Sequence, residues 1–170
     1  AENYKALVIH NEAANFSVGA NIGLALFAAN IAGWPEITNS VKAGQDAYKA
    51  LKYSPFPVVG APSGMALAGG LEILLHCDAV QAHAETYMGL VEVGVGLVPA
   101  WGGCKEMLAR WQNNPEAPQG PMPAVTRVFA TVATATVSRS AVDAPELLYL
   151  RTGDALTMNR DRFLATAKAH

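Results

Sequence analysis

Charged side chains are scarce in this sequence: they make up 15% of its 170 residues, against 51% for hydrophobic residues. Much of the chain must therefore be buried, in a core or at an interface between subunits or domains. The 12 basic residues are scattered and the net charge is −2, which argues against a nucleic-acid-binding surface. With only two cysteines a disulfide framework is not expected, and we predict reduced thiols in a cytoplasmic protein.

Long uninterrupted hydrophobic runs are also absent. The most apolar segment, residues 53–77, is broken by prolines and glycines into short elements, so we do not expect it to span a membrane. The polar start of the chain does not have the pattern of a signal peptide. No initiator Met is present and a strand is expected almost at once, so we expect a fragment of a longer chain whose residues 1–170 form one domain.

Short apolar segments alternate with segments of helical pattern, which predicts an α/β architecture. We expect strands at residues 5–10, 57–61, 79–82 and 86–90, the first of them buried. We expect helices at 22–32, 69–76, 102–111, 126–136, 143–150 and 161–169, and one that starts near Thr38 or Ser40 and runs through Lys52. We expect turns or loops at 64–68, 93–99 and 112–123, the last of which holds four prolines.

Two glycine patterns resemble nucleotide-binding loops only in part. The glycines of segment 64–69 have the spacing of a phosphate-binding loop, but Gly70 and Leu71 stand where that motif requires Lys and Ser or Thr. The pair of glycines at 94–96 begins like a dinucleotide-binding fingerprint, but Pro99 takes the place of the third glycine. The sequence therefore indicates neither nucleotide hydrolysis nor NAD binding.

Other candidate ligands and nucleophiles have simpler interpretations. His76, Cys77 and Asp78 are neighbours on an expected helix, where side chains diverge and cannot easily share one metal, so we expect structural roles. Ser17 and Ser63 lie outside the Gly-x-Ser-x-Gly context of a nucleophile. Three tryptophans are interpreted as packing residues, namely Trp34, Trp101 and Trp111.

Two isolated glutamates stand out against this apolar background. Glu72 is the only charged side chain between residues 53 and 77, and Glu92 is the only one between residues 86 and 104. A buried ion is costly, so such residues are either used in chemistry or held in a structural ion pair or hydrogen bond. Glu72 also follows Gly69 and Gly70, whose N–H groups at a helix start are free donors. Free donors beside a carboxylate favour an enzyme that stabilises an oxyanion while moving protons.

The order and spacing of the motifs are specific when taken together. Segments 16–21, 64–72, 88–92, 96–99 and 102–103 resemble the crotonase (enoyl-CoA hydratase/isomerase) family. The resemblance covers residues 4–111 and weakens after them. It implies an α/β fold with a ββα spiral core, here truncated at its N-terminal side.

The resemblance also implies a reaction on an acyl-CoA thioester. The backbone N–H groups of Ala20 and Gly69 would hold the thioester oxygen, Glu72 would activate a water and Glu92 would protonate the α-carbon. The CoA-binding positions implied are Val18, Ala20, Asn21, Ile22 and Gly69. The implied activity is enoyl-CoA hydratase of fatty-acid β-oxidation, with no metal or redox cofactor.

Three departures and two alternatives accompany this prediction. Asn21 replaces an acid common in the family, Ala68 replaces the first of three glycines, and segment 112–123 is unusually rich in proline. The tail 152–170 resembles the hydratase part of fused 3-hydroxyacyl-CoA dehydrogenases, so a fused dehydrogenase domain is expected in the parent chain. A homodimer or homotrimer is also expected. The alternatives are an isomerase or other acyl-CoA enolate enzyme on the same fold, and a scaffold domain whose site is incomplete.

Overall fold

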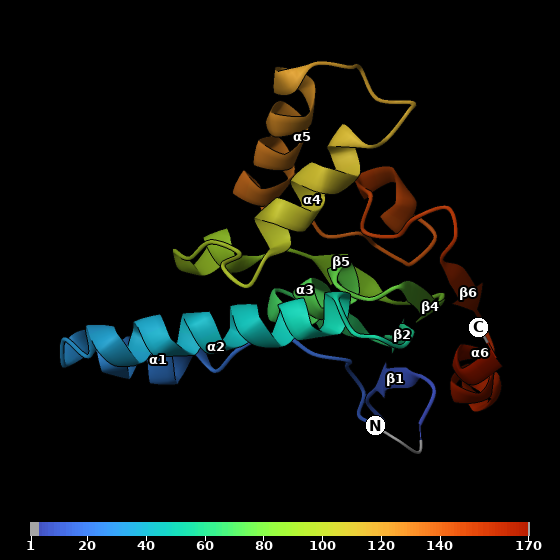
Figure 1. Ribbon diagram of the computed structural model, residues 1–170, viewed down its shortest axis with the longest axis horizontal. Coiled ribbons are helices and arrows are strands. Elements are labelled where there is room, and N and C mark those ends of the chain that lie inside the picture. The colour runs from blue at the N-terminus through green and yellow to red at the C-terminus, as the bar shows by residue number, and fades with distance from the viewer. Residues whose placement is uncertain (1–3, 170) are drawn as a thin grey trace.

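The computed structural model describes residues 4–169, and strands alternate with helices along the chain as predicted (Figure 1). The main sheet has four parallel strands in the order β1-β2-β4-β6. Their bounds are Leu7–His10 for β1, Val58–Ala61 for β2, Ala79–His83 for β4 and Ala155–Thr157 for β6. The two central strands are mostly buried. β1 lies at an edge and is only half-buried, so the expectation that it is a buried strand was wrong.

A second, smaller sheet pairs β3 (Met65–Leu67) with β5 (Tyr87–Gly89) in parallel. Each of its strands follows a strand of the main sheet along the chain after a short connection. The chain runs from β2 to β3 to helix α3 (Gly69–Leu75), and then from β4 to β5 and on to helix α4 (Gly103–Gln112). The strand–strand–helix arrangement therefore occurs twice, which is the ββα pattern predicted for the core.

The remaining helices surround this core. Helices α1 (Ile22–Asn30) and α2 (Trp34–Lys52) form a hairpin that projects from the body, and α5 (Pro121–Ala133) packs against α4 (Figure 1). Helix α6 (Phe163–Ala169) covers β1, β2 and β4. The main core lies among α3, α4, α5 and the sheets, with a smaller cluster under α6. Among residues 4–169, no helix is both long and apolar enough to cross a membrane.

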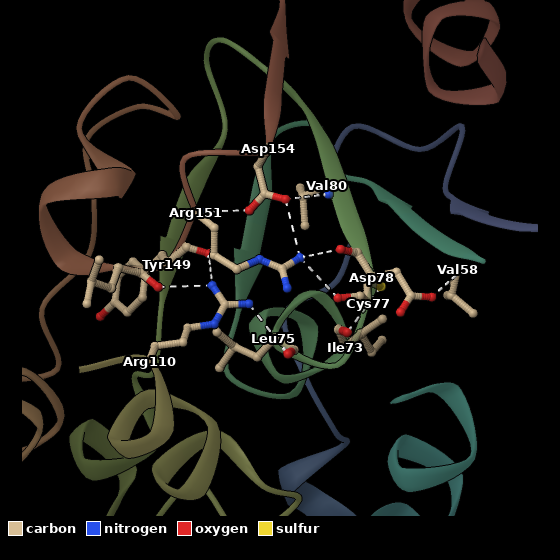
Figure 2. Close-up of polar contacts among 11 residues, drawn as sticks. Val58, Ile73, Leu75, Cys77, Asp78, Val80, Arg110, Tyr149, Arg151 and Asp154 are labelled. Atoms are coloured by element: carbon tan, nitrogen blue, oxygen red, sulfur yellow. Dashed lines mark hydrogen bonds and ion pairs between the residues drawn. The ribbon is translucent and has the colours of Figure 1, made fainter. Parts of the chain in front are cut away.

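Two arginines hold the C-terminal end of α3 in place (Figure 2). Arg110 on α4 donates to the carbonyls of Leu148 and Tyr149 at 3.0 and 2.9 Å, and reaches the carbonyl of Leu75 at 3.4 Å. Arg151 donates to the carbonyls of Cys77 and Asp78. The carbonyls of Leu75, Cys77 and Asp78 lie at or just after the last residue of α3, where carbonyls lack partners within the helix, so the guanidinium groups supply hydrogen-bond donors to them. Helix α3 is thereby fixed against α4.

Several element boundaries differ from those predicted. Helix α2 begins at Trp34 rather than near Thr38, because Pro35 fits the first turn, where no N–H donor is needed. Helix α5 likewise begins at a proline, Pro121, earlier than the predicted start at residue 126, so the loop predicted at 112–123 is shorter than expected. The expected turn at 64–68 contains strand β3.

Three further short elements are 3₁₀ turns. Residues 143–150 form only the turn η2 (Ala144–Leu147), since Leu148 takes a φ of 56° and ends it. The predicted loop at 93–99 begins within another turn, η1 (Glu92–Val95). The last predicted helix is preceded by the turn η3 (Arg160–Arg162) and begins at Phe163.

Candidate functional site

Glu72 is held by backbone amides at the start of α4. Its side chain lies on α3 and the residue is 2% exposed. Its Oε1 accepts hydrogen bonds from the N–H groups of Trp101, at 3.0 Å, and Gly103, at 2.8 Å. Burial raises the pKa of this carboxyl group, and the backbone donors partly offset that rise because they stabilise the charged form. Glu72 is therefore a carboxylate with one oxygen fixed and no cationic partner among these contacts.

Glu92 is buried at the start of η1 and is 9% exposed. Its Oε2 is buried and has no hydrogen-bond partner among the residues that the structure describes. Burial raises its pKa to about 7, and the charge of Glu72 contributes to the rise. A carboxyl group that titrates near neutral pH can both donate and accept a proton at working pH, which is the property of a general acid or base.

The backbone N–H groups of Ala20 and Gly69 lie on two segments that contact each other. Gly19 adopts a φ of 92°, and a Cβ placed on it would lie 3.2 Å from the nitrogen of Gly69. A side chain at this position is therefore disfavoured both by the backbone conformation and by the close approach of the segment that starts α3. Within residues 4–169, neither the Ala20 N–H nor the Gly69 N–H donates a hydrogen bond. Unpaired N–H donors on two segments in contact meet one requirement of a site that holds an oxyanion.

The other predicted CoA-binding positions lie at the start of α1. Val18 and Ile22 are 57% and 46% exposed. Asn21 is the N-cap of α1, and its Oδ1 accepts a hydrogen bond from the N–H of Gly23 at 3.0 Å. An Asn at this position thus has a local structural use, because Asn and Asp cap helices about equally well. Contact of these residues with CoA stays a prediction.

The three adjacent residues that could have been metal ligands each have a structural partner instead. His76 donates from Nδ1 to the carbonyl of Glu72 at 2.7 Å. Cys77 donates to the carbonyl of Ile73, and Asp78 accepts from the N–H of Val58. Within the described part of the chain, no three His, Cys, Asp or Glu side chains gather as a metal site.

The sequence-based interpretation missed two side chains beside the glutamates. Tyr48 on α2 and Cys104 on α4 both have pKa values raised first by burial and then by the charges of Glu72 and Glu92. No sequence pattern connects residue 48 with the later motifs, so only the packing of α2 could reveal it.

Of the three tryptophans, Trp101 and Trp111 pack as predicted, but Trp34 is 60% exposed.

Ala68 has a strained backbone directly before Gly69. Its φ of 51° and ψ of −126° belong to a region that is populated almost only by glycine. The chain therefore carries a Cβ where the backbone disfavours one. Strain of this kind costs roughly 1–3 kcal/mol and is found mainly at functional sites.

Ala68→Gly is expected to raise the free energy of unfolding by about 1 kcal/mol, since release of strain exceeds the added entropy of the unfolded chain. Urea denaturation followed by circular dichroism measures this change. The matched control is Ala43→Gly on the exposed face of α2, which should lower stability by about 1 kcal/mol, because glycine is unfavourable inside a helix. A loss of stability in both variants would contradict the assignment of strain to Ala68.

The raised pKa of Glu92 predicts a pH-dependent cost to folding. Its pKa rises from 4.5 to about 7 on folding, so the folded state binds the proton more tightly than the unfolded state. This contribution stabilises the fold at low pH and is lost as pH rises through 7. We expect Glu92→Gln to exceed wild type in stability by about 1–3 kcal/mol at pH 8, where solvent partly screens the charge, and by less than about 1 kcal/mol at pH 5. Denaturation at the two pH values measures this, and an equal difference at both would contradict it.

Comparison of the sequence with known proteins finds one matching family model and several similar relatives. The family model described as enoyl-CoA hydratase/isomerase matches residues 1–117. A Bacillus subtilis protein named "Probable 3-hydroxyacyl-CoA dehydrogenase" is 42% identical over 166 residues, which cover 98% of this chain and 21% of that protein. The "Fatty acid oxidation complex subunit alpha" of Vibrio vulnificus is 37% identical over 106 residues, or 61% of this chain and 15% of that protein. The chain thus spans about a fifth or less of the length of these two relatives.

Solved structures show the same fold. The crystal structure of an enoyl-CoA hydratase from Shewanella pealeana superimposes with a TM-score of 0.76 at 21% identity, over 99% of this chain and 56% of that one. The ββα arrangement, the matched residues 1–117 and the identity to the Bacillus subtilis protein agree with one another. The chain belongs to the enoyl-CoA hydratase/isomerase family.

Proposed function

We propose that this chain hydrates enoyl-CoA thioesters in fatty-acid β-oxidation. The observation that carries the proposal is the combination of two buried glutamates with two unpaired backbone donors, those of Ala20 and Gly69. Glu72 and Glu92 differ in their surroundings, since Glu72 accepts two amide hydrogen bonds and one oxygen of Glu92 has no partner among residues 4–169. Two acids in different environments suit a reaction that needs one base and one acid.

In the proposed mechanism water adds across the 2,3-double bond of the substrate. Ionised Glu72 accepts a proton from the water as its oxygen bonds to C3. The electron pair of the double bond moves toward the thioester carbonyl, and the N–H groups of Ala20 and Gly69 stabilise the resulting enolate oxygen. Protonated Glu92 then delivers its proton to C2, which completes the 3-hydroxyacyl product. These steps require no metal or redox cofactor.

The names of the relatives suit this reaction. A 3-hydroxyacyl-CoA dehydrogenase acts on the product that a hydratase forms, and the Bacillus subtilis relative of that name is about five times longer than the region matched here. We therefore propose that the parent protein carries a dehydrogenase domain fused to this one. We propose that Val18, Asn21 and Ile22 contact the adenine end of CoA, and that the domain forms a homodimer or homotrimer.

The test is to incubate the chain with crotonyl-CoA and follow the loss of absorbance of the conjugated thioester. The expected result is a decrease in absorbance and formation of 3-hydroxybutyryl-CoA. If the chain instead isomerises a 3-enoyl-CoA and leaves crotonyl-CoA unchanged, the hydratase assignment is wrong and the isomerase is correct. Failure on both substrates, while the full-length parent hydrates crotonyl-CoA, would show that the site is incomplete in this chain.

A further inference from the structure

One face of α2 packs against the loop that supplies the hydrogen bonds to Glu72. This loop, residues 99–103, runs from Pro99 to the start of α4 and contains Trp101 and Gly103, whose N–H groups bind the Glu72 carboxylate. Gln45 on α2 donates from Nε2 to the carbonyl of Ala100 at 2.8 Å. The mechanism proposed above uses the carboxylate but assigns no role to the helix that holds its donors.

The indole of Trp101 occupies a space on α2 that exists only because residue 44 is glycine. A Cβ placed on Gly44 would lie 2.2 Å from Nε1 of Trp101 and 2.4 Å from Cε2. Real Cβ atoms never approach heavy atoms this closely, so the ring could not keep its position beside any larger residue. A glycine inside an exposed helix lowers stability by about 1 kcal/mol relative to alanine. The space that the indole of Trp101 needs explains why glycine stands at position 44 despite this cost.

Tyr48, one helical turn after Gly44, contacts both parts of the site. Its ring lies edge-on to Trp101 with 5.5 Å between ring centroids. Its hydroxyl group donates to the carbonyl of Gly69 at 3.0 Å, and Gly69 is the first residue of α3. One side chain therefore ties the start of α3, which carries Glu72, to the loop whose amides bind Glu72.

The geometry points to Tyr48 as a positioning residue, which clamps the 99–103 loop to α3 so that the amides of Trp101 and Gly103 stay aimed at the Glu72 carboxylate. The role of this clamp in catalysis rests on the proposed hydratase function, whereas its effect on the two hydrogen bonds does not. Tyr48 touches neither the water nor the substrate in the proposed mechanism. Its effect is exerted through the orientation of Glu72.

The test compares Tyr48→Leu with Tyr48→Phe and with the control Tyr53→Leu, whose side chain is 73% exposed just after α2. The first readout is amide hydrogen exchange by NMR. In Tyr48→Leu the amides of Trp101 and Gly103 should exchange at least about tenfold faster than in wild type. The amide of Asn113, which donates to the carbonyl of Ala109 at the far end of α4, should exchange at the wild-type rate.

The second readout is turnover of crotonyl-CoA. Tyr48→Leu should lower kcat about tenfold and change KM less than about twofold, because substrate contacts remain and only the orientation of Glu72 is lost. Tyr48→Phe keeps the ring against Trp101 but lacks the hydroxyl bond to Gly69, so its kcat should fall between those of wild type and Tyr48→Leu. Tyr53→Leu should match wild type in both readouts. If Tyr48→Leu does not fold, Tyr48→Phe removes only the hydroxyl bond to Gly69 and should still speed exchange selectively at Trp101 and Gly103, by a smaller factor.

The outcomes separate this inference from the proposed function. Wild-type exchange at Trp101 and Gly103 in the Tyr48→Leu variant overturns the clamp, and so does an equal acceleration of all protected amides. Selective acceleration with unchanged kcat in an active enzyme overturns the positioning role. If wild type does not hydrate crotonyl-CoA at all, the hydratase proposal fails, while the exchange measurement still decides whether Tyr48 holds the donors of Glu72.

Discussion

Glu92→Gln is expected to bind acyl-CoA as wild type does and to turn over crotonyl-CoA at least about a hundredfold more slowly. Gln has the size of protonated Glu and fits the same buried site, but its amide cannot deliver a proton to C2. The pKa of about 7 suits Glu92 to proton donation, because much of it carries a proton at neutral pH. Steady-state kinetics, together with calorimetric titration of a saturated acyl-CoA, measures both parts of this prediction.

The control for this variant is Glu85→Gln, which removes an exposed carboxylate from the loop between β4 and β5. It should retain wild-type kcat and KM. A mild loss in Glu92→Gln, comparable with that of the control, would show that another group protonates the α-carbon. A large rise in KM with unchanged kcat would instead make Glu92 a binding residue.

Glu72→Gln is expected to hydrate crotonyl-CoA at least about a hundredfold more slowly than wild type, because the variant cannot remove a proton from the attacking water. The carbonyl oxygen of Gln can still accept from the amides of Trp101 and Gly103, so the fold should be preserved. What the variant lacks is a base to take the proton from water. Loss of absorbance of crotonyl-CoA measures the rate, and circular dichroism checks the fold.

A second substrate separates the roles of the two acids. A saturated thioester such as butyryl-CoA has no double bond to hydrate, but its α-proton can exchange with D₂O through Glu92 and the enolate stabilised by Ala20 and Gly69. Glu72→Gln should keep this exchange within about tenfold of wild type, while Glu92→Gln should lose it. The exposed Glu146→Gln variant should leave both reactions unchanged. Equal loss of exchange in the two active-site variants would contradict the division of roles.

The sequence predicted the parts of this protein that depend on near neighbours. Strands at 57–61, 79–82 and 86–90 and helices at 69–76 and 102–111 lie within a few residues of the observed elements. The spacing of apolar residues and the positions of glycines depend only on residues close together in the sequence, so they can be interpreted without coordinates. The least accurate predictions were boundaries. Residues 143–150 have a helical pattern, but Pro145 and the positive φ of Leu148 limit them to a single 3₁₀ turn.

The candidate site was predictable in part for the same reason. Glu72 stands out as a lone charge in an apolar segment, and its distance from Gly69 is fixed by one turn of helix. Glu92 stands out in the same way. The sequence could not indicate which groups surround them. Trp101 lies 29 residues and Gly103 31 residues after Glu72, and their contact depends on how the chain returns after β4 and β5.

The sequence by itself determined the α/β alternation, the family motifs and the two solitary acids, because each is a property of short segments. Only the tertiary structure decided that α2 lies against the loop at 99–103, that Tyr48 bonds to Gly69, and that Glu92 keeps an oxygen without a partner among residues 4–169. These features join segments that are far apart in the sequence. Which of these segments touch is determined by the close packing of side chains in the folded molecule. Burial then sets the pKa of each acid, and burial is a property of the folded molecule alone.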